Sequence, residues 1–303
     1  MSSQSLTRQG LNGPLAKKPV VPACDGAGSV LAIGSEVKDH KVGDRVITFI
    51  WDEADDDKHP SVHDARGMMG MGMDGTLRTH SVFSENCLIT APSTLDWLEA
   101  GTLTCTYISA YNALFGIEGI KAGPGKRVLV QGTGGVSIAA LQLAKAAGAE
   151  VIATTSTEER AAKLTSLGAS HVVNYRTTPD WGQHSKALTP DNVGFDIVID
   201  VGGNETLSQS LAATRVGGLV VMVGGVGSQV DAVPLFAAFI HTCVVRGIIS
   251  GSKAQYKELV RFIDEKKIKP ELDDQVFELA QAKDAYRRLN EKKHYAKIAI
   301  RID

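Results

Sequence analysis

The chain has 303 residues, of which 43% are hydrophobic and 22% charged, and its net charge is −2. This composition is typical of a folded α/β protein and excludes a disordered or fibrous one. The length suits two domains. Lysines and arginines never stand more than two in a row, so neither a nucleic acid nor an anionic membrane is an expected partner.

Membrane insertion and secretion are also not expected from the sequence. No segment holds the about 18 consecutive apolar residues that a membrane span needs, and residues 1–18 lack the apolar stretch of a signal peptide. The four cysteines, Cys24, Cys87, Cys105 and Cys243, include no Cys-x-x-Cys pair, which argues against a disulfide framework and a structural zinc ribbon. A cytoplasmic protein is the expectation.

The first third of the chain predicts a small antiparallel barrel. Residues 1–20 show no regular periodicity and predict an irregular tail. Short strands separated by glycine and aspartate turns follow, and the predicted ones are Ser29–Ile33, Arg45–Phe49 and Leu77–Val82. Residues 51–75 are acidic and glycine-rich, so this segment is expected to be a surface loop.

After about Thr104 apolar strand-like runs alternate with helical segments, which is the pattern of a parallel α/β sheet. The predicted strands are Arg127–Gln131, Glu150–Thr154, His171–Asn174, Phe195–Val201, Gly218–Val223 and Cys243–Ile249. The predicted helices are Ser137–Ala147, Glu159–Leu167 and Ala282–Lys292, and a last strand, Ala296–Ile302, is a candidate to rejoin the first domain.

A glycine-rich turn joins the first of these strands to its helix, and it consists of Gly132, Thr133, Gly134, Gly135, Val136 and Ser137. In a strand–turn–helix context this resembles the G-x-G-x-x-G dinucleotide signature. Gly132 permits the tight turn, Gly134 lets a diphosphate approach the backbone, and the helix amides bind it. Ser137 replaces the usual third glycine. The alternative is a glycine turn that binds nothing.

The residues after the second strand indicate which dinucleotide binds. An acidic residue there would bind the ribose 2′-hydroxyl of NAD, but the segment offers Ser156 and then Arg160. A 2′-phosphate would accept a hydrogen bond from Ser156 and pair with Arg160. NADP(H) is therefore the predicted cofactor. The alternative is that Ser156 only caps a helix and Arg160 is solvated.

Several motifs together resemble the medium-chain dehydrogenase/reductase superfamily, and within it the quinone oxidoreductase-like, zinc-free relatives of alcohol dehydrogenase. The resemblance covers nearly everything from Val20 onward. Besides the glycine turn, the segments that carry it are Asp25–Gly28, Val42–Val46, Asp74–Leu77, Leu167–Ala169, Val173–Arg176 and Asp200–Gly203.

The resemblance implies an α/β fold in which a Rossmann domain, residues 107–246, is inserted in a GroES-like catalytic domain, residues 1–106 and 247–303, with the substrate between them. It places Ser109 beside the nicotinamide and Tyr175 with Ser156 and Arg160 around the 2′-phosphate. It also implies a homodimer paired through the strand within Cys243–Ile249. The residues expected to line the cofactor groove are Val201, Gly202, Gly203, Val223, Gly224 and Gly225.

No metal site is expected. In zinc-dependent relatives a histidine and a cysteine stand where this chain has Cys24 and Cys105, but catalytic zinc needs three protein ligands and residues 1–18 contain no histidine or cysteine. His59 and His63 lie near a cluster of methionines and could suggest a soft-metal site. Pro60 interrupts that segment, and a loop that shapes substrate entry is preferred.

The limited catalytic equipment favours hydride transfer from NADPH to a small quinone or α,β-unsaturated carbonyl, with hydrogen-bond donors stabilising the developing oxyanion. No proton donor can be named. The chain begins closer to the Asp25 motif than its relatives do, so its barrel is expected to be N-terminally shortened. An alternative function is therefore an NADP(H)-binding or interaction protein without catalysis, and a zinc-dependent alcohol dehydrogenase is a third possibility.

Overall fold

The computed structural model describes residues 19–225 and 231–302. The chain divides into two compact units, one formed by residues 1–108 and 250–303 and the other by residues 109–249. Most of the predicted N-terminal tail lies outside the described residues.

The first unit contains a three-stranded antiparallel sheet in the order β1-β2-β3 and a parallel pair, β10-β11. Ala27 pairs with Ile47 and Val46 with Thr90. The strands are β1 (Ala27–Ser29), β2 (Arg45–Thr48), β3 (Leu88–Thr90), β10 (Leu272–Glu278) and β11 (Lys297–Arg301). The helical segments are η1 (Val62–Gly67), η2 (Glu85–Cys87), α2 (Trp97–Ala100), η3 (Leu103–Tyr107), α9 (Lys253–Lys266), η5 (Leu279–Gln281) and α10 (Ala282–Asn290).

Two strands predicted for this unit are wrong. Strand β1 ends at Ser29, where a strand over Ser29–Ile33 was expected, and Leu77–Val82 forms no strand. The apolar residues that suggested them face solvent, since Leu31 is 67% and Val82 is 94% exposed. The Leu77 amide instead donates to the Pro22 carbonyl, at 3.2 Å. Strand β3 was not predicted, because its three residues are too few to show a periodicity.

The second unit is a parallel six-stranded sheet in the order β6-β5-β4-β7-β8-β9, which is the strand order of a Rossmann domain. Its strands are β4 (Arg127–Gln131), β5 (Glu150–Thr155), β6 (His171–Asn174), β7 (Phe195–Asp200), β8 (Thr214–Met222) and β9 (Val244–Gly247). Its helices are α3 (Ile108–Phe115), α4 (Gly135–Ala146), α5 (Glu158–Ser166), α6 (Trp181–Ala187), η4 (Pro190–Asn192), α7 (Asn204–Ala213) and α8 (Phe236–Ile240).

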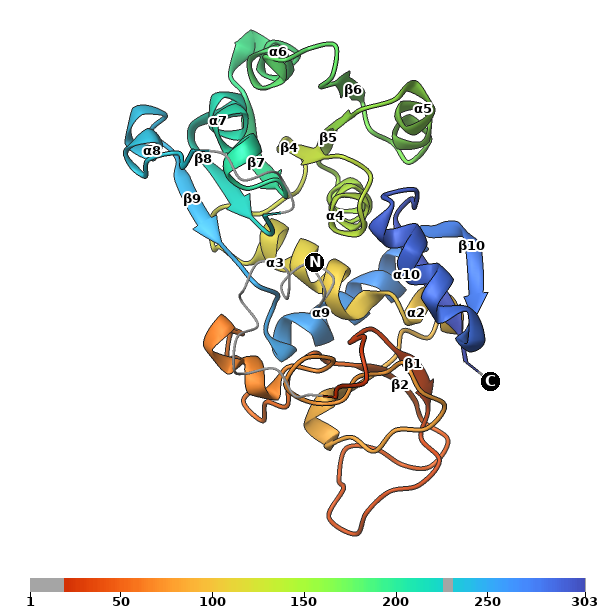
Figure 1. The fold of residues 1–303 in the computed structure, drawn as a ribbon. Helices are drawn as coiled ribbons and strands as arrows, with labels where there is room; N and C mark the ends of the chain where they lie inside the picture. The colour runs from red at the N-terminus through yellow and green to blue at the C-terminus, as the bar shows by residue number, and fades with distance from the viewer. Residues whose placement is uncertain (1–18, 226–230, 303) are drawn as a thin grey trace. The chain divides into compact units, whose positions relative to one another are not determined.

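The predicted α/β class is confirmed, and every predicted strand of the parallel sheet is present. Strands β4 and β6 have the predicted bounds, and β8 begins four residues earlier than expected, at Thr214. All residues of β7 are buried, as is usual where helices cover both faces of a sheet. Figure 1 shows β6 at one edge of this sheet and β9 at the other.

Candidate functional site

The glycine-rich turn connects β4 to α4 at the carboxyl edge of the parallel sheet. Gly132 has a φ of 75°, a conformation that glycine adopts without strain, and its amide donates to the Thr154 carbonyl at 2.8 Å. A Cβ atom at Gly132 or Gly134 would meet nothing within 4 Å. No side chain caps α4, whose N-cap is Gly134. The turn therefore offers open space beside uncapped helix amides, which fits a bound diphosphate.

Ser137 stands at the position of the usual third glycine, and its side chain is directed inward. It is 1% exposed, and its hydroxyl donates to the Gln131 carbonyl at 2.6 Å. This hydrogen bond fixes the first turn of α4 against the last residue of β4. The serine thus holds the helix close to the sheet, while the backbone on the open side of the turn stays accessible.

A buried polar cluster joins the loops after β4 and β7. The side-chain oxygen of Gln131 accepts from the Val201 amide at 3.2 Å, and its amide group donates to Ser210 at 2.6 Å. The Asp200 carboxylate accepts from Ser210 at 2.5 Å and from the Gly203 amide at 2.8 Å. Gln131 and Asp200 are 5% and 0% exposed. The two loops at this edge are therefore held together through side chains.

Sequence reasoning selected Val201–Gly203 but missed the two residues that hold this segment. The signal was the position of Gln131 and Asp200, each a polar residue directly after the apolar run of its strand. The segment after β8 contacts the loop after β7 as well. The Val223 amide donates to the Asp200 carbonyl at 2.9 Å, and a Cβ at Gly203 would lie 3.2 Å from Gly225.

The three residues predicted to surround a 2′-phosphate lie next to the carboxyl ends of β5 and β6. Ser156 directly follows β5, Tyr175 directly follows β6, and Arg160 lies in the first turn of α5. The Tyr175 ring is 42% exposed, and its amide donates to the Thr155 carbonyl at 3.0 Å. No carboxylate stands between the last residue of β5 and the Thr157 cap of α5.

The predicted cofactor residues thus fall mainly at one edge of one sheet. Those after β4, β5, β6, β7 and β8 share the carboxyl edge, where open α/β sheets bind their ligands. Ser109 differs, because it lies on α3 and is 4% exposed.

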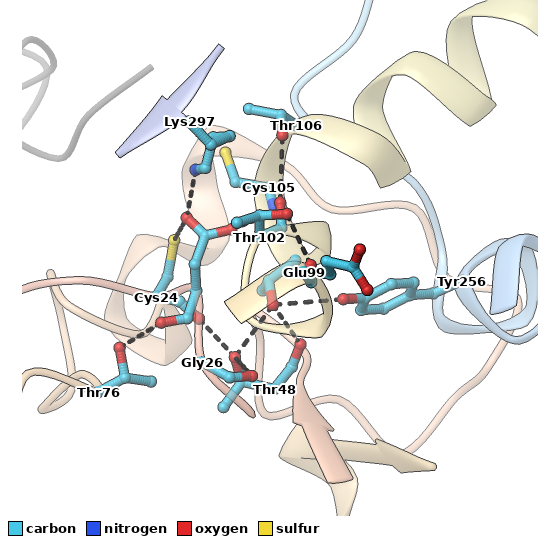
Figure 2. Close-up of polar contacts among 12 residues, drawn as sticks. Cys24, Gly26, Thr48, Thr76, Glu99, Thr102, Cys105, Thr106, Tyr256 and Lys297 are labelled. Carbon is cyan, nitrogen blue, oxygen red and sulfur yellow. Dashed lines mark hydrogen bonds and ion pairs between the residues drawn. The ribbon is translucent and has the colours of Figure 1, made fainter. Parts of the chain in front are cut away.

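The first unit holds a separate polar cluster around the Asp25 carboxylate (Figure 2). One carboxylate oxygen accepts from the Cys105 amide at 3.1 Å, and the other accepts from the Lys297 ammonium at 2.9 Å. The Cys24 thiol lies 3.9 Å from this second oxygen. Ala23, which precedes Cys24, has a φ of 72°, a conformation that is costly for a residue with a side chain.

The charges in this cluster stabilise one another. Burial alone would lower the pKa of Lys297, but the Asp25 carboxylate and the neighbouring thiols outweigh it and raise that pKa. Hydrogen bonding between the two thiols raises the pKa of Cys24 and lowers that of Cys105. The cluster therefore contains a protonated lysine, an ionised carboxylate and two thiols of unequal acidity.

This donor set does not fit a catalytic zinc ion. Zinc sites of that kind use three protein ligands, whereas here two thiols are accompanied by a carboxylate that already pairs with Lys297. Among residues 19–225 and 231–302, no group of three or more histidine, cysteine, aspartate or glutamate side chains is placed to hold a metal ion.

The loop after β2 forms a pocket of about 270 Å³. His59 and His63 both line it, together with the Lys58–Glu53 ion pair, whose charged atoms lie 2.5 Å apart. The two histidines thus line one pocket although Pro60 interrupts the segment between them. Within the part of the chain that the structure describes, no helix combines the length and apolarity of a membrane span.

Comparisons with known proteins agree with this architecture. Residues 3–93 match the family model of the alcohol dehydrogenase GroES-like domain, and residues 135–265 match that of zinc-binding dehydrogenases. A zinc-type alcohol dehydrogenase-like protein of Schizosaccharomyces pombe is 36% identical over 94% of this chain and 83% of its own length. Human quinone oxidoreductase is 29% identical over 72% of this chain and 60% of its own length.

Among solved structures, a crystal structure described as a putative alcohol dehydrogenase from Sinorhizobium meliloti 1021 is 32% identical. It superposes with a TM-score of 0.87 and covers 99% of this chain and 86% of its own. The matched domains, the Rossmann strand order and these relatives confirm the resemblance seen in the sequence. The chain belongs to the medium-chain dehydrogenase/reductase superfamily of oxidoreductases.

Proposed function

We propose that this protein is an NADPH-dependent reductase that transfers hydride to a quinone or an α,β-unsaturated carbonyl without zinc. The observation that carries the proposal is the carboxyl edge of the parallel sheet. There an open glycine turn is followed, after β5, by the Ser156 hydroxyl and then by Arg160 in the first turn of α5; no carboxylate stands at the end of β5 itself, and Glu158 and Glu159 come only within α5. This arrangement suits a dinucleotide with a phosphate on its adenosine ribose.

The residues of the chain bind and orient the cofactor. The amides after Gly134 hold the diphosphate, while Ser156, Arg160 and Tyr175 surround the 2′-phosphate. The cluster of Gln131 and Asp200 holds the Val201–Gly203 segment in place along the cofactor. When bound, the reduced nicotinamide supplies the hydride, and Ser109 is assigned to its vicinity.

The choice of substrate rests on the donor set and on one relative. Alcohol oxidation requires a group that lowers the pKa of the alcohol, and the Cys24–Cys105 cluster lacks the three ligands of a zinc ion that would do so. Electron-poor acceptors need less assistance, because a positioned hydride and hydrogen-bond donors suffice. The similarity to human quinone oxidoreductase points to the same substrate class.

Binding measurements with both dinucleotides test the cofactor assignment. The protein is expected to bind NADPH more tightly than NADH, and Arg160→Glu is expected to weaken NADPH selectively. Loss of one charge-assisted contact of about 1.5–3 kcal/mol corresponds to roughly 10- to 150-fold in affinity. Lys163→Glu, an exposed charge reversal on the same helix, is the matched control. An NADPH/NADH preference that Arg160→Glu leaves unchanged would refute the assignment.

Turnover is tested by NADPH consumption with a panel of quinones, enones, aldehydes and ketones. We expect consumption with quinones or enones that added zinc does not increase. Binding of NADPH without turnover of any acceptor would favour a non-catalytic cofactor-binding protein. Activity that appears only with about one zinc per subunit would favour a zinc-dependent alcohol dehydrogenase.

We also propose a homodimer in which β9 pairs with β9 of a second copy. This strand is at the edge of the sheet, and exposed sheet edges tend to pair with another chain. The neighbouring helix α8 exposes Phe236 and Phe239, which are 64% and 72% exposed and stack on each other. A molar mass of two chains in light scattering is expected, and Phe239→Glu should reduce it. Val193→Glu, also at an exposed apolar residue, should not.

A further inference from the structure

Two cysteines from distant parts of the chain meet at one carboxylate in the first unit. The Cys24 thiol donates to one oxygen of Asp25 at 3.9 Å, and the Cys105 amide donates to the other at 3.1 Å. Both cysteines are half-buried as residues. Cys105 lies in η3, which is a π-helical turn, a rare conformation that is frequent at functional sites. Figure 2 shows the Cys24 sulfur beside the carboxylate oxygen that Lys297 contacts.

The backbone on both sides of this contact is fixed. The Thr48 hydroxyl donates to the Cys24 carbonyl at 2.6 Å and lies 3.1 Å from the hydroxyl of Thr104, the residue before Cys105. The Asp25 carboxylate accepts from the Cys105 amide at 3.1 Å. Thr48 and Thr104 are 4% and 0% exposed. The two segments are therefore held side by side, which favours the closely placed Cβ atoms that a disulfide needs.

The interaction between the two thiols favours one thiolate. Hydrogen bonding with Cys24 is the main cause that lowers the pKa of Cys105, and the Lys297 charge lowers it further, against burial and the Asp25 charge, while the pKa of Cys24 is raised. Lys297 is held in place by its 2.9 Å contact with Asp25. A thiolate beside a fixed ammonium group is a nucleophile, and a second thiol in contact with it can resolve an oxidised intermediate.

We propose that Cys24 and Cys105 form a thiol pair that hydroperoxides oxidise to an intramolecular disulfide. The Cys105 thiolate attacks one peroxide oxygen, the O–O bond breaks, and the departing oxygen takes a proton to leave as water or an alcohol. Cys105 is then a sulfenic acid. The Cys24 sulfur attacks the Cys105 sulfur, the S–O bond breaks, and hydroxide leaves with the Cys24 proton as water. Two electrons pass from the thiol pair to each peroxide.

The experiment uses the full chain, reduced and then treated with hydrogen peroxide. The protein is denatured, remaining thiols are alkylated, and disulfides are mapped by peptide mass spectrometry. Two of the four thiols are expected to be lost, with a peptide linking Cys24 to Cys105, and dithiothreitol should restore both. A disulfide between two chains, or oxidation of Cys105 to a sulfinic acid while Cys24 remains a thiol, would overturn the proposal.

Variants separate the roles of the two cysteines. Cys24→Ser should let the Cys105 sulfenic acid accumulate, where dimedone traps it, and Cys105→Ser should leave Cys24 a thiol. Cys87→Ser and Cys243→Ser are controls in which the linkage should still form; burial raises the pKa of Cys87 to about 12. Should a pair variant fail to fold, the wild-type map still decides. Because this assay contains no dinucleotide, its outcome is independent of the proposed reductase activity.

Discussion

Replacement of Gln131 by methionine tests whether the polar cluster between β4 and β7 holds the loops of the candidate site. Methionine has a similar length but neither the carbonyl oxygen nor the amide group of glutamine. The Val201 amide would lose its 3.2 Å acceptor, and Ser210 would lose the 2.6 Å contact with the Gln131 amide. Ser210 would keep its 2.5 Å hydrogen bond to Asp200, so the Val201 amide is the group left without a partner.

The magnitude follows from these contacts. A fully buried donor left without an acceptor costs about 1–3 kcal/mol, so the half-buried Val201 amide falls at the lower end of this range, and a neutral hydrogen bond contributes about 1 kcal/mol net. The apolar methionine side chain regains part of this loss, because about 0.8 kcal/mol accompanies each buried CH₂. We therefore expect Gln131→Met to lower the free energy of unfolding by about 2 kcal/mol and also to weaken NADPH binding.

The assay is a urea titration followed by circular dichroism, with the slope compared between variants so that a change in midpoint reports stability. The matched control is Gln183→Met on α6, where the glutamine is exposed and a change within about 0.5 kcal/mol is expected. If Gln131→Met stays within the range of this control, the cluster does not hold the loops and the reasoning is refuted.

Three further predictions concern two substitutions and the response to acid. Arg288→Ala should lower the free energy of unfolding by about 3–5 kcal/mol, because it leaves a buried carboxylate without its cation. That carboxylate, Asp273, is 4% exposed and lies 2.7 Å from the Arg288 guanidinium. An unchanged urea midpoint would contradict this prediction. Burial alone would raise the pKa values of Asp273 and Asp196, but hydrogen bonds from arginines and backbone amides keep both below normal. The contribution of these two carboxylates to folding stability is thus complete above the unfolded-state pKa of about 3.9 and is lost as the pH falls further. Urea midpoints measured between neutral and acidic pH would show this loss. Gly132→Ala should cost about 1–2 kcal/mol, because φ at this position is 75°, and thermal unfolding would detect the loss.

The parallel sheet could be predicted from the sequence because its strands are buried on both faces. Such strands appear as continuous apolar runs, and the runs at β4 and β7 end where glycine-containing turns begin. The antiparallel sheet of the first unit has no such signal. Its strands are three or four residues long, and exposed apolar residues such as Leu31 and Val82 imitate a strand where none forms.

The cofactor turn could be located because glycine is required at particular backbone positions, and such a requirement is local. The residues that hold the loops of the candidate site in place could not be located in this way. Gln131 is an ordinary glutamine until its contacts with Val201 and Ser210 are known. The Cys24–Cys105 contact likewise depends on Thr48 and Asp25, which belong to different segments. Neither cluster leaves a periodicity in the sequence.

What these clusters share is a carboxylate that accepts several hydrogen bonds from separate segments. An ionised carboxylate has about four acceptor positions, so one aspartate can connect loops that no regular hydrogen-bond pattern joins. Asp200 does this for the loop after β7, and Asp25 does it for Cys105 and Lys297. Asp264 does it for the Ser93–Thr94 turn. For Asp264, burial alone would raise the pKa, but hydrogen bonds from Ser93 and Thr94 outweigh it and lower that pKa, so the carboxylate that fixes this turn also makes it sensitive to acid.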